Sequence, residues 1–285
     1  MSRPQAGIHP PTVADGEPPA AFWRDPSLPF IVESRRACRS RACYVPHRHP
    51  TFSIGAVDEG RSLFTGAPGG PIGLTAGTLV FVPAERVHAC NPVPDTAWSY
   101  QMLHLDAAWL RHAREEHAPA RSRAAEPVRI STDRALYRRF SQLNALLFSG
   151  AGPHDKEAAL IEFMGDIDTG SGVHIEPQAV PPGTHKRIRP VLERLRDAPD
   201  TNASLSELAA LARMSRYQLI RTFRTATGMT PHAWQLNQRV NLARERIRKG
   251  AAIAEVALQL GFADQAHFQR VFKAHTGVTP GRFRA

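Results

Sequence analysis

The stretch QRVFKAHTGVTP, residues 269–280, repeats a pattern that the chain has already used at residues 220–231, where it reads IRTFRTATGMTP. Both copies contain an Arg, a Phe, a basic residue, a Thr-Gly pair, an apolar residue and a Thr-Pro pair in the same order. The copies are 49 residues apart. A repeat of this kind indicates that one supersecondary unit occurs twice near the C-terminus.

Each copy is preceded by another short helical pattern, with apolar residues at 205, 208, 209 and 212 in the first unit and at 253, 256, 257 and 260 in the second. The offset is 48 residues between these first helices, so one extra residue lies in the second unit's turn. Ser215 and Asp264 are good N-caps for the second helices, and Gly228 and Gly277 suit left-handed C-caps. Each unit is therefore predicted to be a helix-turn-helix, whose second helix can enter a major groove.

One long helix is predicted between the two units. Thr230 is its expected N-cap, Pro231 its first residue, and Gly250 its end. Its roughly 19 residues span about 28 Å at ~1.5 Å per residue. One turn of B-DNA advances ~34 Å, so two second helices held on such a spacer would meet the same face of the duplex.

The two second helices are predicted to bury one face and to present the other to DNA. Leu219, Phe223, Phe268 and Phe272 occupy the buried positions in both copies. Arg and Gln pair with guanine and adenine edges, which makes the opposite face a candidate reading surface. Its residues are Arg216, Tyr217, Ile220, Arg221, Arg224, Gln265, Ala266, Gln269, Arg270 and Lys273. The alternative is a helical bundle in which the repeat is purely structural.

The net charge of +10 lies in the same part of the chain. Residues 184–285 hold 18 Lys and Arg against 7 Asp and Glu, whereas residues 1–183 hold 18 against 19. A local basic excess is the electrostatic pattern of a domain that binds a polyanion. A solvated basic surface is the other interpretation of the charge taken alone.

Residues 184–285 resemble the C-terminal domain of the AraC/XylS family of bacterial transcription regulators. The resemblance rests on LAALARMSRYQLIRTFRTATGMTP, on RVNLARERIRKG and on IAEVALQLGFADQAHFQRVFKAHTGVTPGRFR. It implies a sequence-specific regulator whose partners are double-stranded DNA, a small-molecule effector, RNA polymerase and a second copy of the chain. Arg213 departs from the family pattern, in which Gly is frequent at the first turn; a positive φ there would strain an Arg.

The rest of the chain divides by composition. Residues 1–25 are rich in Pro, Ala and Gly, which predicts a disordered tail. Residues 26–105 alternate short β-type runs with Gly/Pro turns, as in a small barrel or sandwich. Three helical patterns follow in 106–168, whose apolar stripes predict a dimerisation region or a surface buried against the barrel. Residues 169–183 have a linker composition. The predicted fold class is α+β, with an all-α C-terminal domain.

Two stretches of the N-terminal half, PHRHPTFSIGAVDEG and GTLVFVPAERVHACN, resemble the two motifs of a cupin barrel, the usual effector domain of the family. His47 and His49 alternate on a strand and so point into one cavity, which His88 of the second motif would share. The expectation is that these histidines contact an organic effector and that no metal or cofactor binds, since no acidic residue follows the His pair where metal-binding cupins have a Glu. A three-His metal site and histidines without any ligand role are the alternatives. The even-numbered residues from Trp98 to His104 are predicted to be core.

Few other functions fit this sequence. It has no Gly-rich phosphate loop and no nucleophile motif, so the chain is not expected to be an enzyme; a metal-dependent cupin enzyme fused to a DNA-binding domain is the alternative. An effector-independent DNA binder is a third possibility. Three cysteines, no apolar leader and no long apolar run favour the cytoplasm. The sequence names neither the effector nor the promoter.

Overall fold

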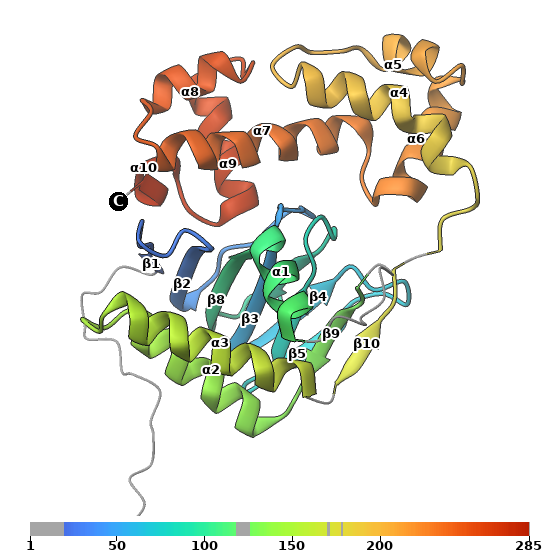
Figure 1. Cartoon of the computed structure of the whole chain (residues 1–285). Coiled ribbons are helices and arrows are strands. Elements are labelled where there is room, and N and C mark those ends of the chain that lie inside the picture. The colour runs from blue at the N-terminus through green and yellow to red at the C-terminus, as the bar shows by residue number, and fades with distance from the viewer. Residues whose placement is uncertain (1–19, 118–125, 170–171, 178, 285) are drawn as a thin grey trace, which may run out of the picture.

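The computed structural model describes residues 20–117, 126–169, 172–177 and 179–284 as two domains (Figure 1). The N-terminal domain is built on antiparallel sheets, and the C-terminal domain is all helical, which confirms the α+β class. Figure 1 shows the C-terminal domain, in orange and red, on one side of the sheets. Within the described residues, no helix has both the length and the apolar character that crossing a membrane requires.

The N-terminal domain contains two antiparallel sheets among its described residues. The larger sheet has the order β1-β2-β8-β3-β6-β9-β10, and the smaller one the order β5-β4-β7. This is a cupin-like pair of facing sheets that the strand pairing does not close into one barrel. The strands are β1 (Ala20–Trp23), β2 (Ile31–Ser40), β3 (Thr51–Glu59), β4 (Arg61–Thr65), β5 (Ile72–Thr75), β6 (Leu79–Val82), β7 (Ala89–Pro92), β8 (Trp98–Asp106), β9 (Val128–Ser131) and β10 (Val173–Ile175).

Strand β6 shows why these segments form a buried sheet. All four of its residues are buried, because both faces of the large sheet are covered. Leu79 and Phe81 belong to the core between this sheet and the helices, whereas Val80 and Val82 belong to the core shared with the small sheet. The twofold alternation of side chains along a strand divides the residues between the two cores in this way.

The helices that follow the sheets are α1 (Ala107–His117), α2 (Arg134–Leu147) and α3 (Pro153–Thr169). Asp133 caps α2 by accepting from the backbone N–H groups of its first turn. Leu136, Phe140 and Leu147 of α2 and Leu160 of α3 are buried in one core with strand residues of the large sheet. Most residues of these apolar stripes are therefore buried within the chain, whereas Ile161 of α3 is 55% exposed, and the dimerisation role of this region stays a prediction.

Three strands occur where the composition predicted something else. β1 lies inside the predicted disordered tail and pairs with β2; residues 1–19 of that tail lie outside the described residues. β9 lies inside the predicted helical region and joins the large sheet beside β6. β10 lies in the predicted linker and pairs with β9. Each has only three or four residues, so its sequence carries too short a pattern to identify a strand, and sheet pairing decides its conformation.

The C-terminal domain contains two helix-turn-helix units joined by one helix. Its helices are α4 (Thr184–Asp197), α5 (Leu205–Leu211), α6 (Arg216–Thr227), α7 (Pro231–Arg248), α8 (Ile253–Gln259), α9 (Gln265–Thr276) and α10 (Pro280–Arg284). Ser215 and Asp264 cap α6 and α9 through their side chains, and Gly228 and Gly277 are left-handed C-caps, as predicted. Arg213 has a φ of 51°, the strained value that Gly would adopt freely.

Each unit has its own core, and α7 contributes to both. Phe223 and Leu219 pack with Trp234 from the start of α7, whereas Phe268 and Phe272 pack with Val240 and the later turns of α7. The offset of 48 residues between α5 and α8 and of 49 between α6 and α9 agrees with the sequence interpretation.

Candidate effector cavity and DNA-reading surface

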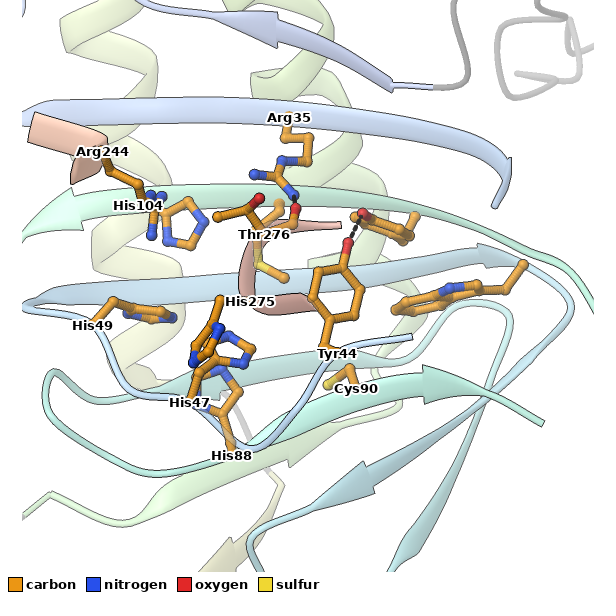
Figure 2. A pocket seen from close by; sticks show the side chains of 13 residues that line it. Arg35, Tyr44, His47, His49, His88, Cys90, His104, Arg244, His275 and Thr276 are labelled. Atoms are coloured by element: carbon orange, nitrogen blue, oxygen red, sulfur yellow. Dashed lines mark hydrogen bonds between the residues drawn. The ribbon is translucent and has the colours of Figure 1, made fainter. Parts of the chain in front are cut away.

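A cavity of about 50 Å³ lies where the C-terminal domain meets the N-terminal sheets. Its walls come from both domains, since α7 and the last turn of α9 supply part of the lining (Figure 2). The lining residues are Arg35, Tyr44, His47, His49, His88, Cys90, Trp98, Tyr100, Met102, His104, Arg244, His275 and Thr276. The even-numbered residues of β8 therefore line the cavity, which corrects the prediction that they are only core.

The three predicted histidines do come together. The ligand nitrogens of His47, His49 and His88 all lie within 4.8 Å of one another. His47 and His88 form an isolated backbone bridge, with N···O distances of 3.0 and 2.9 Å, so two neighbouring loops hold the imidazoles side by side. The ring centroids of His47 and His88 are 4.8 Å apart, and those of His49 and His88 are 5.0 Å apart.

Burial keeps these imidazoles neutral. Desolvation lowers the pKa of His88 to about 4. Desolvation, together with the charges of neighbouring imidazoles, lowers the pKa of both His47 and His49 well below the ordinary value. A neutral imidazole has a lone pair on one ring nitrogen, so this part of the cavity can accept a hydrogen bond or bind a metal ion.

Another side of the cavity carries positive charge. Glu33, which is fully buried, lies between three guanidinium groups: Arg24 at 2.6 Å, Arg35 at 3.2 Å and Arg244 at 3.8 Å. Desolvation raises the pKa of Glu33, but the nearby charges of Arg35, Arg244 and Arg24 outweigh it, and the pKa falls to about 2. One carboxylate thus faces three cations, two of which line the cavity.

Several of these cavity residues were not among the predicted site residues. Arg244 lies on α7 and His275 near the end of α9, both in the domain predicted to read DNA. Tyr44 precedes the His pair and shares a 2.6 Å hydrogen bond between its hydroxyl and that of Tyr100. The repeat pattern concerns contacts within each helix-turn-helix unit, so it carries no signal for residues that face the other domain.

The two domains are joined by direct contacts around the cavity. The backbone N–H of Val45 donates to the carbonyl of Ala274 at 3.0 Å, and Arg35 donates to the carbonyl of Thr276 at 2.8 Å. The backbone N–H of Arg48 donates to the Asn237 side chain at 3.1 Å. The Arg48 guanidinium also lies 4.5 Å from the ring centroid of Trp234. These contacts fix α7 and α9 to the rim of the sheets.

The predicted reading surface is open to solvent. All ten of its residues are exposed on α6 and α9, including Tyr217 at 73% and Ile220 at 37%. Within the described part of the chain no ion pair is recorded for its four arginines and Lys273, so their charges are available to a polyanion. Both helices begin at side-chain caps, so their N-termini have a defined backbone.

Comparison with known proteins identifies the family to which this two-domain chain belongs. The family model described as "AraC-like ligand binding domain" matches residues 32–164, and the one described as "Helix-turn-helix domain" matches residues 208–285. The chain belongs to the AraC family of transcriptional regulators. It combines a ligand-binding domain with a helix-turn-helix domain.

Curated AraC-family relatives match mainly in the DNA-binding domain. The transcriptional regulator MtrA of Neisseria gonorrhoeae is 33% identical over 100 residues, which cover 35% of this chain and 33% of that protein. The chain therefore spans about a third of the length of this first relative. The regulator YbfI of Bacillus subtilis is 23% identical over 78% of this chain and 80% of its own length.

Solved structures show a similar arrangement of the whole AraC-family fold. Apo ToxT of Vibrio cholerae has a TM-score of 0.56 at 12% identity and covers 93% of this chain and 96% of its own. Other ToxT structures contain an unsaturated fatty acid or (E)-4-(8-methylnaphthalen-1-yl)but-3-enoic acid. At this identity the likeness concerns the fold.

Proposed function

We propose that this AraC-family protein is a transcription regulator that binds a small anionic effector in the cavity between its domains. The observation that carries the proposal is the shared lining, in which Arg35 of the sheet and Arg244 of α7 face one cavity. A ligand that contacts both domains favours one relative arrangement of them over others. Its occupancy would therefore change how the two reading helices are presented to DNA.

Charge supports an anion. Glu33 is the carboxylate recorded beside Arg24, Arg35 and Arg244, so two positive charges of this cluster have no acidic partner within the described residues. Burial lowers the pKa of Arg244 to about 10, which still leaves it protonated at neutral pH. The buried Nε of Arg35 has no hydrogen-bond partner in the structure. A carboxylate or similar anion would supply both the charge and the acceptor.

Size restricts the effector as well. One water molecule needs about 10–15 Å³ of such space, so a cavity of about 50 Å³ holds roughly four water-sized groups. A cavity of this volume therefore suits a small acid.

The effector prediction is tested with the full-length protein and a panel of small carboxylic acids. Arg244→Ala should lose the thermal stabilisation that a binding acid gives, because one of its two cationic contacts is removed. At a hundredfold excess over Kd that stabilisation is about 2.7 kcal/mol in the unmodified chain. Arg246→Ala is the matched control, since it lies on the same helix and does not line the cavity. Equal stabilisation of both variants by the same acid would contradict the proposal.

We also propose that the exposed faces of α6 and α9 read two successive major grooves. The residues that differ between the copies, such as Tyr217 and Gln269, would set base preference near the helix N-termini. Arg224 and Lys273 keep the charge at equivalent positions, which suits phosphate contact. Arg216, Ile220 and Arg221 on α6 and Gln265, Ala266 and Arg270 on α9 complete the proposed interface.

Gln269→Ala should change which sequences are selected, whereas Lys273→Ala should weaken all of them. A lost base contact costs about 1–3 kcal/mol at its cognate base pair. A lost phosphate contact reduces affinity about equally for every sequence and flattens the dependence on salt by about one unit of slope. Site selection from a random DNA pool with both variants measures this. An unchanged motif for Gln269→Ala and an altered one for Lys273→Ala would show that the reading face is assigned wrongly.

The remaining partners follow from the family resemblance. A homodimer and contact with RNA polymerase stay predictions, and so does the cytoplasmic location that action on chromosomal DNA requires. We propose that the protein is a regulator and not an enzyme. Most of the named relatives are regulators, although one of them, Ada of Escherichia coli, is a bifunctional activator and DNA repair enzyme.

A further inference from the structure

The three clustered histidines share a hydrogen-bonding pattern that prepares them as ligands. The Nδ1 atom of His47 lies 2.9 Å from the carbonyl oxygen of Val45, that of His88 lies 2.9 Å from the carbonyl of Arg86, and that of His49 lies 3.1 Å from the carbonyl of Thr51. A carbonyl oxygen can only accept, so each Nδ1 carries the proton. The lone pair of each imidazole is therefore on Nε2, which in His49 lies 3.4 Å from the Ser53 hydroxyl, and the carbonyl orients the ring as it does for metal-binding histidines.

The spacing of the cluster fits one metal ion. Zinc–imidazole bonds are about 2.0–2.1 Å long, so two nitrogens on one tetrahedral ion lie about 3.4 Å apart. The ligand nitrogens of the three histidines are within 4.8 Å of one another before any ion is added. Side-chain movements of less than about 1 Å would complete the coordination.

The DNA-binding domain brings a fourth imidazole to the same cavity. His275 of α9 lines it, and Figure 2 draws its side chain in the same part of the view as His47 and His88. Its Nδ1 lies 2.8 Å from the carbonyl oxygen of Val271, so its Nε2 is again the free nitrogen.

The fifth imidazole of the cavity, His104, is less suitable. Its Nδ1 lies 2.8 Å from the hydroxyl oxygen of Ser53. The same nitrogen is 3.3 Å from the Thr51 hydroxyl, and Figure 2 shows the Arg244 side chain next to the His104 ring. Among the described residues, the ligand nitrogens within 4.8 Å of one another are those of His47, His49 and His88, and His275 lines the same cavity from α9.

We propose that His47, His49 and His88 bind one divalent first-row transition metal ion, and that His275 moves towards it from α9 as the fourth ligand, which joins the effector domain to the DNA-binding domain. A set of four imidazoles suits zinc, and also iron, nickel or copper. The sequence predicted no metal because no acidic residue follows the His pair. His275, which comes from the other domain, takes the place of that missing ligand.

The neighbouring arginines favour a state in which an anion binds together with the metal ion. A divalent ion adds positive charge to a cavity that already holds Arg35 and Arg244. An anion bound between the metal and the guanidinium groups would offset both charges, so metal and anionic effector should strengthen each other's binding. This step rests on the proposed function, whereas the coordination itself rests only on the four imidazoles.

The test uses the full-length protein, stripped with a chelator and titrated with zinc chloride and, separately, cobalt chloride. We expect one ion per chain and the intense visible absorption of four-coordinate cobalt. His88→Ala and His47→Ala should lose the stoichiometric ion while keeping the circular dichroism of the unmodified chain. His275→Ala should bind zinc at least about tenfold more weakly, which is the loss typical of removing a group beside a metal ion. It should also lose the cobalt absorption bands. His185→Ala, an exposed histidine of α4, is the control and should change neither.

Any one of three results would contradict the metal site. In the first the folded protein binds no stoichiometric zinc, in the second His88→Ala keeps the zinc affinity of the unmodified chain, and in the third His275→Ala keeps both that affinity and the cobalt spectrum. Because no DNA or acid is present, this outcome is separate from that of the effector proposal. Arg244→Ala, which should lose the anion response, should still bind zinc.

Discussion

Replacing Glu33 by Gln is expected to release the DNA-binding domain from the sheets. Glu33 is fully buried and is the carboxylate that Arg24, Arg35 and Arg244 share across the domain boundary. Its neutral amide analogue has nearly the same volume but leaves the guanidinium groups without a counter-charge. Removing one partner of a buried ion pair costs about 3–5 kcal/mol, because the remaining charge stays desolvated. Separation of the domains lets the arginines regain water.

Hydrogen exchange measures this release directly. The backbone N–H groups of Val45 and Arg48 donate across the boundary, so in Glu33→Gln their peptide should exchange deuterium much faster. The N–H of Val57, bonded to Thr78 within the N-terminal domain, should stay protected. Glu162→Gln changes an exposed carboxylate of α3 and is the matched control. Equal exchange at Val45 in both variants would rule out the role given to Glu33.

Low pH should weaken the same cluster of ion pairs around Glu33. The pKa of Glu33 is lowered from 4.5 to about 2, so the folded state favours the ionised carboxylate. The stability that this contributes is fully present above about pH 4.5 and is lost as the pH falls from there towards 2. We expect deuterium exchange at Val45, relative to that at Val57, to increase as the pH falls through that range. Glu33→Gln should show no such increase.

The C-terminal domain was predictable because its signals are local. Ser215 and Asp264 cap helices through bonds within four residues, and Gly228 and Gly277 end helices through their own φ angles. The spacing of Phe223 and Phe272 is likewise a property of one helix. Local rules of this kind leave a pattern in the sequence that does not depend on the rest of the fold.

Only some of the cavity residues could be predicted from the sequence, because the others reach the cavity through contacts between the domains. His47, His49 and His88 lie on two short motifs, but an isolated bridge between loops brings them together, and not the strand on which the spacing predicted His47 and His49. Arg244 and His275 reach the cavity only because the two domains pack against each other. Arg244 directly follows Ala243 of the α7 core, so periodicity assigns it to the polar flank of a DNA-binding helix. Its burial depends on Glu33, which is 211 positions earlier in the chain.

The rigid connection between the two reading units depends on Arg239. This α7 residue is 2% exposed and donates to the carbonyl oxygens of Pro199 at 2.5 Å, Asp200 at 3.2 Å and Gly261 at 2.8 Å, and to the Asn202 side chain. It therefore joins the segment before α5 to the turn between α8 and α9. The two segments are so close that a Cβ on Gly261 would lie 1.8 Å from the carbonyl oxygen of Asp200.

Arg239→Ala is accordingly expected to destabilise the domain by about 2–4 kcal/mol, since several part-buried acceptors lose a charged donor at once and a hydrogen bond to a charged group contributes about 1.5–3 kcal/mol. Arg239→Lys should recover little of this stability, because an ammonium cannot reproduce the planar fork of a guanidinium.

The loss of Arg239 should also change DNA recognition. Two units held at a fixed distance tolerate only one spacing of their half-sites, whereas units freed from this connection bind several spacings, each more weakly. Thermal unfolding, together with binding to operators lengthened by a few base pairs, measures both effects. Arg246→Ala, which removes an exposed bond to Gln259 on the same helix, is the control. If Arg239→Ala unfolded at the temperature of this control and kept its strict half-site spacing, the two units would owe their arrangement to the apolar cores alone.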